Sequence, residues 1–284
     1  MEVYATAGDN WLGGEDFDTV IAQAMLESLK LDDKQLTALQ RSAIRTHAQR
    51  AKHALSASHS TNLCITLELG KSTTTREFSL TRAEFEERCK PLLERVQRTL
   101  ERAMKDARLG PAAVNQVILV GGSTRMPVIR NLVGRLFGQL PLSHLNPDEI
   151  MGMGAAVQAA MRDNDSALAD FVLTDVCPYT LGIEIAVESG PSSYEQGHFL
   201  PIIERNSPVP VSRVETIRPV SRTQRQVLCK IYQGESRLTV NNVLLGSIEI
   251  EVPLLAKDRS VDVRFTYDNE GLLEVKTEVK ANAT

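Results

Sequence analysis

The spacing of the apolar residues changes once along this chain, near residues 170–178. Before that point apolar residues recur every three or four positions, as on one face of a helix. After Pro178 they alternate with polar residues, as on one face of a β-strand. The sequence therefore predicts a helix-rich domain followed by an all-β domain, and the length of 284 residues suits two ordinary domains.

The helix-rich part has the element order of an α/β fold, with strands placed between helices. Strand patterns occupy residues 63–69 and the apolar run 117–120, and "MEVYATAGD" at residues 1–9 also begins like a strand. One helix is predicted to begin after the glycine pair at 13–14, and another to span about 33–55. Their expected core stripes are Phe17, Val20, Ile21, Ala24 and Leu29 in the first, and Leu36, Leu39, Ala43, Ala48, Ala51 and Leu55 in the second.

Helix boundary signals divide this part further. Thr81 and Glu84 have the spacing of a capping box, in which each side chain satisfies a backbone N–H of the other. Pro91 is expected to kink or divide the long helix that follows. In "NPDEI", Asn146 is the expected N-cap of another helix and Pro147 its first residue.

The all-β part consists of short alternating runs separated by turn signals. The clearest runs are Val227, Cys229 and Ile231; Ile248, Ile250 and Val252; and Val261, Val263, Phe265 and Tyr267. The segment "DNEG" at 268–271 is a turn signal between the last run and the next strand. Strands at this spacing predict an antiparallel β-sandwich.

Composition excludes several classes of protein. A net charge of -4 and an aromatic content of 5% argue against nucleic acid or an anionic membrane as the main partner. No apolar run is long enough to span a membrane, and the first residues lack the pattern of a signal peptide. The cysteines at 64, 89, 177 and 229 lie far apart without metal-ligand spacing, which predicts reduced, buried thiols in a cytoplasmic protein.

The segment "VILVGGSTRMP" at 117–127 reads as a strand whose end approaches a ligand. Gly121 and Gly122 lack a Cβ and permit close approach to the backbone, and Ser123 supplies a hydroxyl. Arg125 could stack on a planar ring, and Pro127 suits the first turn of a helix. From these residues alone, a tight strand-to-helix turn without a ligand is an equally reasonable interpretation.

A second polar group lies on one predicted helix face. Gln49, Lys52, His53 and Ser56 fall at positions i, i+3, i+4 and i+7, where they could hold the hydroxyls of a sugar and an aromatic base. An ordinary solvated face has the same pattern. The glycine pair before "EDFD" adds only weak support, and no phosphate-binding P-loop is present.

The segment between the two domains, "ADFVLTD", is unusual because most linkers are polar. Its apolar residues are Phe171, Val172 and Leu173. They suit either a strand end that packs locally or a linker that docks reversibly, and the residues alone leave both possibilities open.

Six motifs together resemble one family. They are "GDNWLGGEDFD", "QRAKHALS", "VILVGGSTRMPVI", "NPDEIMGMGAAVQAA", "VLTDVCPYTLGIE" and "ERNSPVPV". In order and spacing they are similar to the DnaK-type, seventy-kilodalton heat-shock chaperones. The segments "DVCPYTLGIE" and "PIIERNSPVPVSRVET" are most similar to the HscC branch of that family.

The resemblance implies a division of the chain into three parts. Residues 1–169 correspond to the second lobe of an actin-like nucleotide-binding domain, 170–175 to an interdomain linker, and 176–284 to a β-sandwich that binds extended peptides. The implied nucleotide-binding residues are Gly14, Gln49, Lys52, His53, Ser56, Gly121, Gly122, Ser123, Arg125, Met126 and Asp148. The family usually has glutamate at position 49 and arginine at position 53, so altered ADP affinity is expected here.

The resemblance also assigns a peptide groove and a docking linker. The implied groove residues are Ile183, Ala186, Ile217, Val220, Val227 and Cys229, of which Ala186 and Val220 would arch over the bound peptide. The implied linker residues are Phe171, Val172, Leu173 and Asp175. Because a sandwich core would place Val227 and Cys229 on one face as well, their spacing does not distinguish a pocket from a core.

The function implied is that of an ATP-dependent chaperone in the cytoplasm. ATP or ADP with magnesium, unfolded client peptides, a J-domain co-chaperone and a nucleotide-exchange factor are the expected ligands and partners. The sequence contains no counterpart of the family's phosphate loops, catalytic lysine or helical lid, so the chain alone is expected to be inactive as an ATPase and to hold no metal.

This interpretation treats the chain as a portion of a longer protein, with an exposed lobe face that favours self-association. The alternative is a natural truncated module that binds peptides or a partner without an ATPase cycle.

Overall fold

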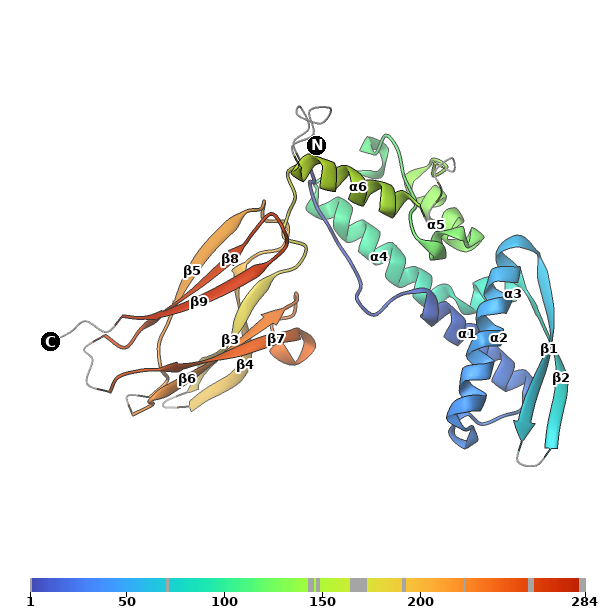
Figure 1. The fold of residues 1–284 in the computed structure, drawn as a ribbon, viewed down its shortest axis with the longest axis horizontal. Coiled ribbons are helices and arrows are strands. Elements are labelled where there is room, and N and C mark those ends of the chain that lie inside the picture. Colours follow the sequence, from blue (N-terminus) through green and yellow to red (C-terminus); the bar gives the residue numbers. More distant parts are fainter. Residues whose placement is uncertain are drawn as a thin grey trace. The chain divides into compact units, whose positions relative to one another are not determined.

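The structure is a computed structural model that describes residues 2–69, 72–142, 146, 149–163, 173–190, 193–221, 223–254 and 258–280. The chain forms two compact units (Figure 1). One unit is Gly8–Asp170, and the other joins Phe171–Thr284 with the first residues, Met1–Ala7. The strand predicted at residues 1–9 is not formed, because among the described residues 2–9 only Glu2 makes a bridge, to Thr174 of the other unit.

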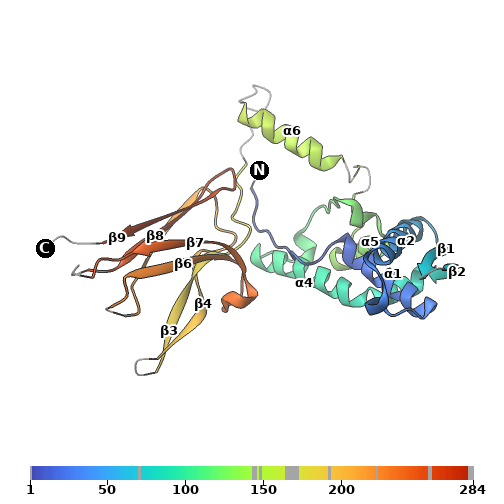
Figure 2. The ribbon, with the colours of Figure 1, turned by 60° about the horizontal axis from the view of Figure 1, so that its bottom comes forward.

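The unit Gly8–Asp170 is mostly helical, with one antiparallel hairpin. Its elements are α1 (Gly14–Leu29), α2 (Ala38–Ala57), β1 (Ser60–Leu69), β2 (Ser72–Thr81), α3 (Arg82–Arg88), α4 (Lys90–Asp106), α5 (Pro127–Phe137) and α6 (Ile150–Arg162), with short 3-10 turns η1 (Asp33–Gln35), η2 (Pro111–Ala113) and η3 (Gly122–Arg125). Helix α2 packs against both α1 and β1 (Figures 1 and 2).

The core of this unit lies between α1, α2 and the hairpin. The predicted stripe of α1 is confirmed, since four of its five residues are buried and Val20 packs against them. On α2 the prediction of Leu39 is wrong, because its side chain is 74% exposed and Ile44 is buried instead. Thr37 caps the helix, so Leu39 lies in its first turn and about 140° around the axis from Ile44.

The boundary between α3 and α4 follows the predicted signals. The Glu84 N–H donates to Thr81 Oγ1 at 3.3 Å, and the Thr81 N–H donates to Glu84 Oε2 at 2.9 Å, which confirms the capping box. The helices divide at Cys89, and Pro91 lies in the first turn of α4. Proline is tolerated there because its missing N–H would have no helical partner.

Two other predictions in this unit are wrong. Residues 117–120 form no strand, only a single parallel bridge between Ile118 and Leu142, and both Ile118 and Val120 are exposed. A β-strand forms only where a neighbouring strand supplies hydrogen-bond partners along its length. Among the described residues, only Leu142 pairs with the run 117–120. Helix α6 begins at Ile150 with Glu149 as N-cap, so Asn146 is not its N-cap, although its carbonyl accepts the Ile150 N–H at 3.1 Å. Pro147, the predicted first residue of this helix, lies outside the described residues.

The other unit consists of two antiparallel sheets. The strand order of the larger sheet is β4-β3-β6-β7, and that of the smaller sheet is β5-β8-β9. The strands are β3 (Leu181–Gly190), β4 (Ser193–Ile203), β5 (Val211–Ile217), β6 (Gln226–Gln233), β7 (Val243–Glu251), β8 (Val261–Tyr267) and β9 (Leu273–Val279), with a 3-10 turn η5 (Thr239–Asn241).

One hydrophobic core contains residues of both sheets. The larger sheet contributes Ile183, Ile203, Cys229, Ile231 and Ile250, and the smaller sheet contributes Val211, Val261, Val263 and Phe265. The alternation predicted for β6 and β8 is confirmed, and so is the turn at 268–271, where the Gly271 N–H donates to the Asp268 carbonyl at 3.2 Å.

All four cysteines are free thiols, as predicted, but only three are buried. Cys64 is exposed, because it lies opposite Glu77 on the outer face of the hairpin. Burial raises the pKa of Cys89 to about 12 and that of Cys229 to about 11.

Candidate functional site

The loop between Gly121 and Pro127 has a conformation that explains its sequence. Gly121 has a φ of 84°, a left-handed value that a residue with a Cβ rarely adopts. The Thr124 hydroxyl donates to the Gly121 carbonyl at 2.7 Å and closes the turn η3. Met126 is buried and anchors the loop, and Pro127 is the first residue of α5, as predicted.

This loop and the C-terminal half of α2 enclose a pocket of about 690 Å³. Its lining residues are Lys52, His53, Ser56, Ala57, Gly122, Ser123, Arg125 and Met126. Two segments that are more than sixty residues apart in the sequence therefore supply the two walls of a single pocket.

Gly14, the first residue of α1, lies beside the pocket. A Cβ at this position would lie 3.2 Å from Ser123 Oγ and 3.4 Å from Lys52 Nζ. The Lys52 ammonium donates to the Gly14 carbonyl at 2.9 Å, so the start of α1 directly contacts one wall residue. Glycine permits this close approach of α1, α2 and the loop.

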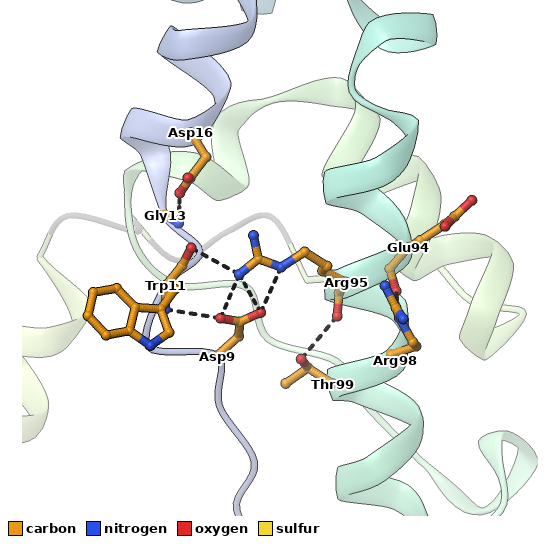
Figure 3. Close-up of polar contacts among 8 residues, drawn as sticks. All are labelled: Asp9, Trp11, Gly13, Asp16, Glu94, Arg95, Arg98 and Thr99. Atoms are coloured by element: carbon orange, nitrogen blue, oxygen red, sulfur yellow. Dashed lines mark hydrogen bonds and ion pairs between the residues drawn. The ribbon is translucent and has the colours of Figure 1, made fainter. Parts of the chain in front are cut away.

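The segment before α1 is fixed by an arginine from α4 (Figure 3). Arg95 donates from Nε to Asp9 Oδ2 at 3.0 Å and from Nη2 to Asp9 Oδ1 at 2.8 Å. It also donates to the Trp11 carbonyl at 2.9 Å, while the Gly13 N–H donates to Asp16 at 2.7 Å. A two-point arginine–carboxylate contact has a defined orientation, so these bonds position Gly14.

Three described residues of the predicted nucleotide site do not line this pocket. Gln49 is exposed and lies about one turn before Lys52, and Gly121 precedes the lining part of the loop. Gly14 contacts the wall residues from outside the pocket. Asp148 lies outside the described residues.

The predicted peptide groove divides into two groups of residues. Ala186, Ile217, Val220 and Val227 line a hollow of about 520 Å³. Ile183 and Cys229 are 0% and 2% exposed and belong to the core behind it. The same hollow also has lining residues that the sequence did not suggest: Glu184, Ile185, Gln196, Leu200, Thr216, Arg218, Pro219, Gln224, Leu228 and Lys230.

The charge of Glu184 in this hollow is balanced within the sheet. Lys230 Nζ lies 3.2 Å from its carboxylate, and the Tyr232 hydroxyl donates to it at 3.0 Å. Burial and this carboxylate raise the pKa of Tyr232. The charged end of the hollow is thus a cross-strand network, whereas the residues predicted from the sequence form its apolar part.

The described part of the linker pairs with the first residues of the chain. The Val3 N–H donates to the Thr174 carbonyl at 2.9 Å, and the Thr6 N–H donates to Asn206 Oδ1 at 2.8 Å. Asp175 accepts a backbone bond from Val209 at 3.0 Å. Of the other predicted linker residues, Leu173 is partly buried, and Phe171 and Val172 lie outside the described residues.

Within the described residues, no group of three or more His, Cys, Asp or Glu side chains is arranged to hold a metal ion. No helix among the same residues is long and apolar enough to cross a membrane.

Comparison with known proteins shows the family. The family model "Hsp70 protein" matches residues 1–284. The chain is 35% identical to chaperone protein DnaK of Thermosipho melanesiensis, over 97% of this chain and 46% of that protein. It is 37% identical to the DnaK of Deinococcus radiodurans, over 99% of this chain and 45% of that protein. It is 36% identical to a heat shock 70 kDa protein of Penicillium citrinum, over 99% of this chain and 55% of that protein.

The chain therefore belongs to the Hsp70 family of chaperones. This confirms the resemblance to DnaK-type proteins that the six motifs indicated. The chain spans about half the length of the curated relatives it matches.

Proposed function

We propose that this chain is a portion of an ATP-dependent molecular chaperone. It binds the adenosine part of ATP or ADP in the pocket between α2 and η3. It also holds an extended apolar peptide in the hollow of the β unit. The observation that carries the nucleotide proposal is that seven of the residues implied by the family motifs line one pocket.

The pocket suits an adenine nucleotide in size and in chemistry. A volume of about 690 Å³ falls in the range of small-molecule sites. Arg125 and His53 offer planar groups for a base, and Lys52 and Ser56 offer polar atoms for ribose hydroxyls. In the longer protein, ATP with magnesium would supply the phosphoryl group that is hydrolysed. This chain alone is not expected to hydrolyse ATP.

The domain assignment belongs to the same proposal. Residues 1–169 would be the second lobe of an actin-like ATPase domain, 170–175 the linker, and 176–284 the peptide-binding β-sandwich. Val3 pairs with Thr174 at the end of the proposed linker, and both residues belong to the β unit.

The peptide proposal rests on the apolar wall of the hollow. Ile217 and Val227 are partly buried there, and Val220 is exposed at its rim. Ile183 and Cys229 would support this wall from the core rather than contact the peptide. An extended peptide in such a site forms main-chain hydrogen bonds and places one apolar side chain in the pocket.

Further parts of the interpretation stay predictions. They are a J-domain co-chaperone, a nucleotide-exchange factor, a cytoplasmic location and a relation to the HscC branch. Self-association is also predicted, and exposed Ile118 and Val120 support it. A monodisperse monomer in light scattering at high concentration would argue against it.

A titration of fluorescently labelled ADP with this chain tests the nucleotide proposal. We expect saturable binding that unlabelled ADP displaces, and an affinity at least about fivefold lower in Arg125→Ala. Arg130→Ala is the matched control, since Arg130 is an exposed arginine on α5 that does not line the pocket. Absence of binding by the unaltered chain, or equal effects of both variants, would contradict the proposal.

The second candidate function is a peptide-binding module without nucleotide control. The hollow with its apolar wall favours it independently of the pocket. Titration of a labelled apolar heptapeptide, with and without ADP, distinguishes the two. Peptide binding that ADP leaves unchanged supports the second candidate.

A further inference from the structure

A buried ion pair joins α1 to the pocket wall. Lys52 on α2 donates from Nζ to Asp18 Oδ2 on α1 at 2.8 Å. The side chains of Lys52 and Asp18 are only 10% and 13% exposed. Because both charges are largely removed from water, breaking this pair would leave an uncompensated buried charge.

The hydrogen bonds of Lys52 leave one donor for a ligand. A lysine ammonium has three N–H groups. One is bonded to Asp18 and another to the Gly14 carbonyl at 2.9 Å. No third acceptor for Nζ is found in the part of the chain that the structure describes, and Lys52 lines the pocket.

Asp18 is not explained by stability alone. Its other oxygen, Oδ1, is buried and has no hydrogen-bond partner among the described residues. A buried carboxylate oxygen without a protein hydrogen-bond partner contributes no stability of its own. Lys52 is the one side chain with which the described structure pairs Asp18. The arrangement therefore favours control of Lys52 as the role of Asp18.

We propose that Asp18 is a positioning residue of the nucleotide pocket, and this inference rests on the function proposed above. Asp18 holds the ammonium of Lys52 in one place and compensates its charge. Lys52 then meets the ligand as a directed hydrogen-bond donor to a neutral hydroxyl of the nucleoside, and it attracts phosphate only weakly. The pocket thereby selects the nucleoside end of its ligand.

The test compares adenosine with adenosine monophosphate, each titrated calorimetrically into the full chain. Asp18→Asn removes the compensating charge at nearly constant shape. We expect this variant to favour the monophosphate over adenosine about fivefold more than the unaltered chain does, and to show a steeper salt dependence. The matched control is Glu15→Gln, which removes the same charge from an exposed position on α1 and should leave the ratio unchanged.

Lys52→Met, alone and combined with Asp18→Asn, is a second pair of variants that tests the inference if Asp18→Asn alone does not fold. Lys52→Met combined with Asp18→Asn removes both charges, which is tolerated better than removing one. In the Lys52→Met background, the Asp18 substitution should no longer change the ratio of the two affinities.

Equal weakening of both ligands by Asp18→Asn would overturn the inference, since it would show a structural role only. An unchanged ratio would overturn it as well. If the unaltered chain binds neither ligand, the proposed function itself fails, and the inference fails with it. These failures are distinguishable because the last is seen without any substitution.

Discussion

The backbone N–H of Val3 donates to the carbonyl of Thr174 at 2.9 Å, and Glu2 and Thr174 form a parallel bridge. This bond connects the first residues of the chain with the segment that joins its two units. Asn206, in the loop between β4 and β5, also holds the first residues by accepting the Thr6 N–H at 2.8 Å. Thr174 is therefore held to the first residues by backbone pairing.

A disulfide tests this pairing. We expect Glu2→Cys combined with Thr174→Cys to form an intramolecular crosslink on mild oxidation, because neighbouring strands lie about 4.8 Å apart and disulfides bridge Cα atoms at about that distance. The background is Cys64→Ser, which removes the exposed thiol. The crosslinked chain is detected by its changed mobility on a non-reducing gel.

The control pair is Thr174→Cys with Ser193→Cys, at the far end of the β3–β4 hairpin. It should not crosslink within one chain, since the strand β3 separates the two positions by roughly 30 Å. Similar crosslinking of both pairs would show that the first residues are not held at Thr174.

The two glycines at the start of α1, the N-cap Gly13 and the first residue Gly14, are predicted to differ in function. Gly14→Ala places a Cβ 3.2 Å from Ser123 Oγ and 3.4 Å from Lys52 Nζ, so it should shift the Ser123 side chain in the pocket wall. We expect ADP affinity to fall by about fivefold or more. Gly13→Ala is the control, because no atom lies within 4 Å of its Cβ. Calorimetric titration of ADP into both variants measures this difference. Equal ADP affinities of the two variants would be incompatible with Gly14 lying at the site.

The buried thiols predict a loss of stability at high pH. Burial raises the pKa of Cys89 to about 12 and of Cys229 to about 11, from 9.0. Well below pH 9 both thiols are neutral in the folded and unfolded states. Between pH 9 and about 11 only the unfolded state ionises, so the free energy of unfolding falls by up to about 1.4 kcal/mol per pH unit for each thiol.

Urea denaturation at a series of pH values measures this fall. The slope should be smaller in Cys229→Ala than in the unaltered chain, and Cys64→Ser should leave it unchanged because Cys64 is exposed. The account of Cys229 would be wrong if the slope were the same in all three proteins.

Val220 is predicted to act in peptide binding and not in folding. It is 47% exposed at the rim of the hollow, so Val220→Ala should change the free energy of unfolding by less than about 0.5 kcal/mol. Heptapeptide affinity should fall about fivefold, because two methyl groups are lost from the contact. Val214→Ala is the matched control, since Val214 is 39% exposed on β5 and does not line the hollow.

Local periodicity predicted the elements whose partners lie nearby in the structure. The stripe of α1 and the alternation of β6 and β8 came directly from the spacing of apolar residues. The run 117–120 has an equally apolar pattern, yet it forms only the bridge between Ile118 and Leu142. A strand depends on what lies beside it, and that is not encoded in its own residues.

The nucleotide pocket was also predictable only where its residues are close together in the sequence. Lys52, His53 and Ser56 share a helix face by spacing alone, and the family motif added the loop at 121–126. Asp18 was missed because it lies on another helix, 34 residues before Lys52, in a segment whose acids suit any helix N-terminus.

The peptide site shows where spacing cannot decide. Val227 and Cys229 lie on the same face of β6, and the sequence left open whether they form a pocket or a core. The structure places Val227 at the hollow and Cys229 in the core. Val227 and Cys229 therefore differ in their surroundings because they lie at different positions along β6.

The central claim is that adenine nucleotide binds between α2 and η3, and hydrogen exchange measures this most directly. With saturating ADP, exchange should slow in peptides that cover residues 49–57 and 121–127, which contain the pocket walls. Peptides from the β1–β2 hairpin serve as the internal reference and should not change. Unchanged exchange in both wall segments, or protection confined to other parts of the chain, would contradict the account.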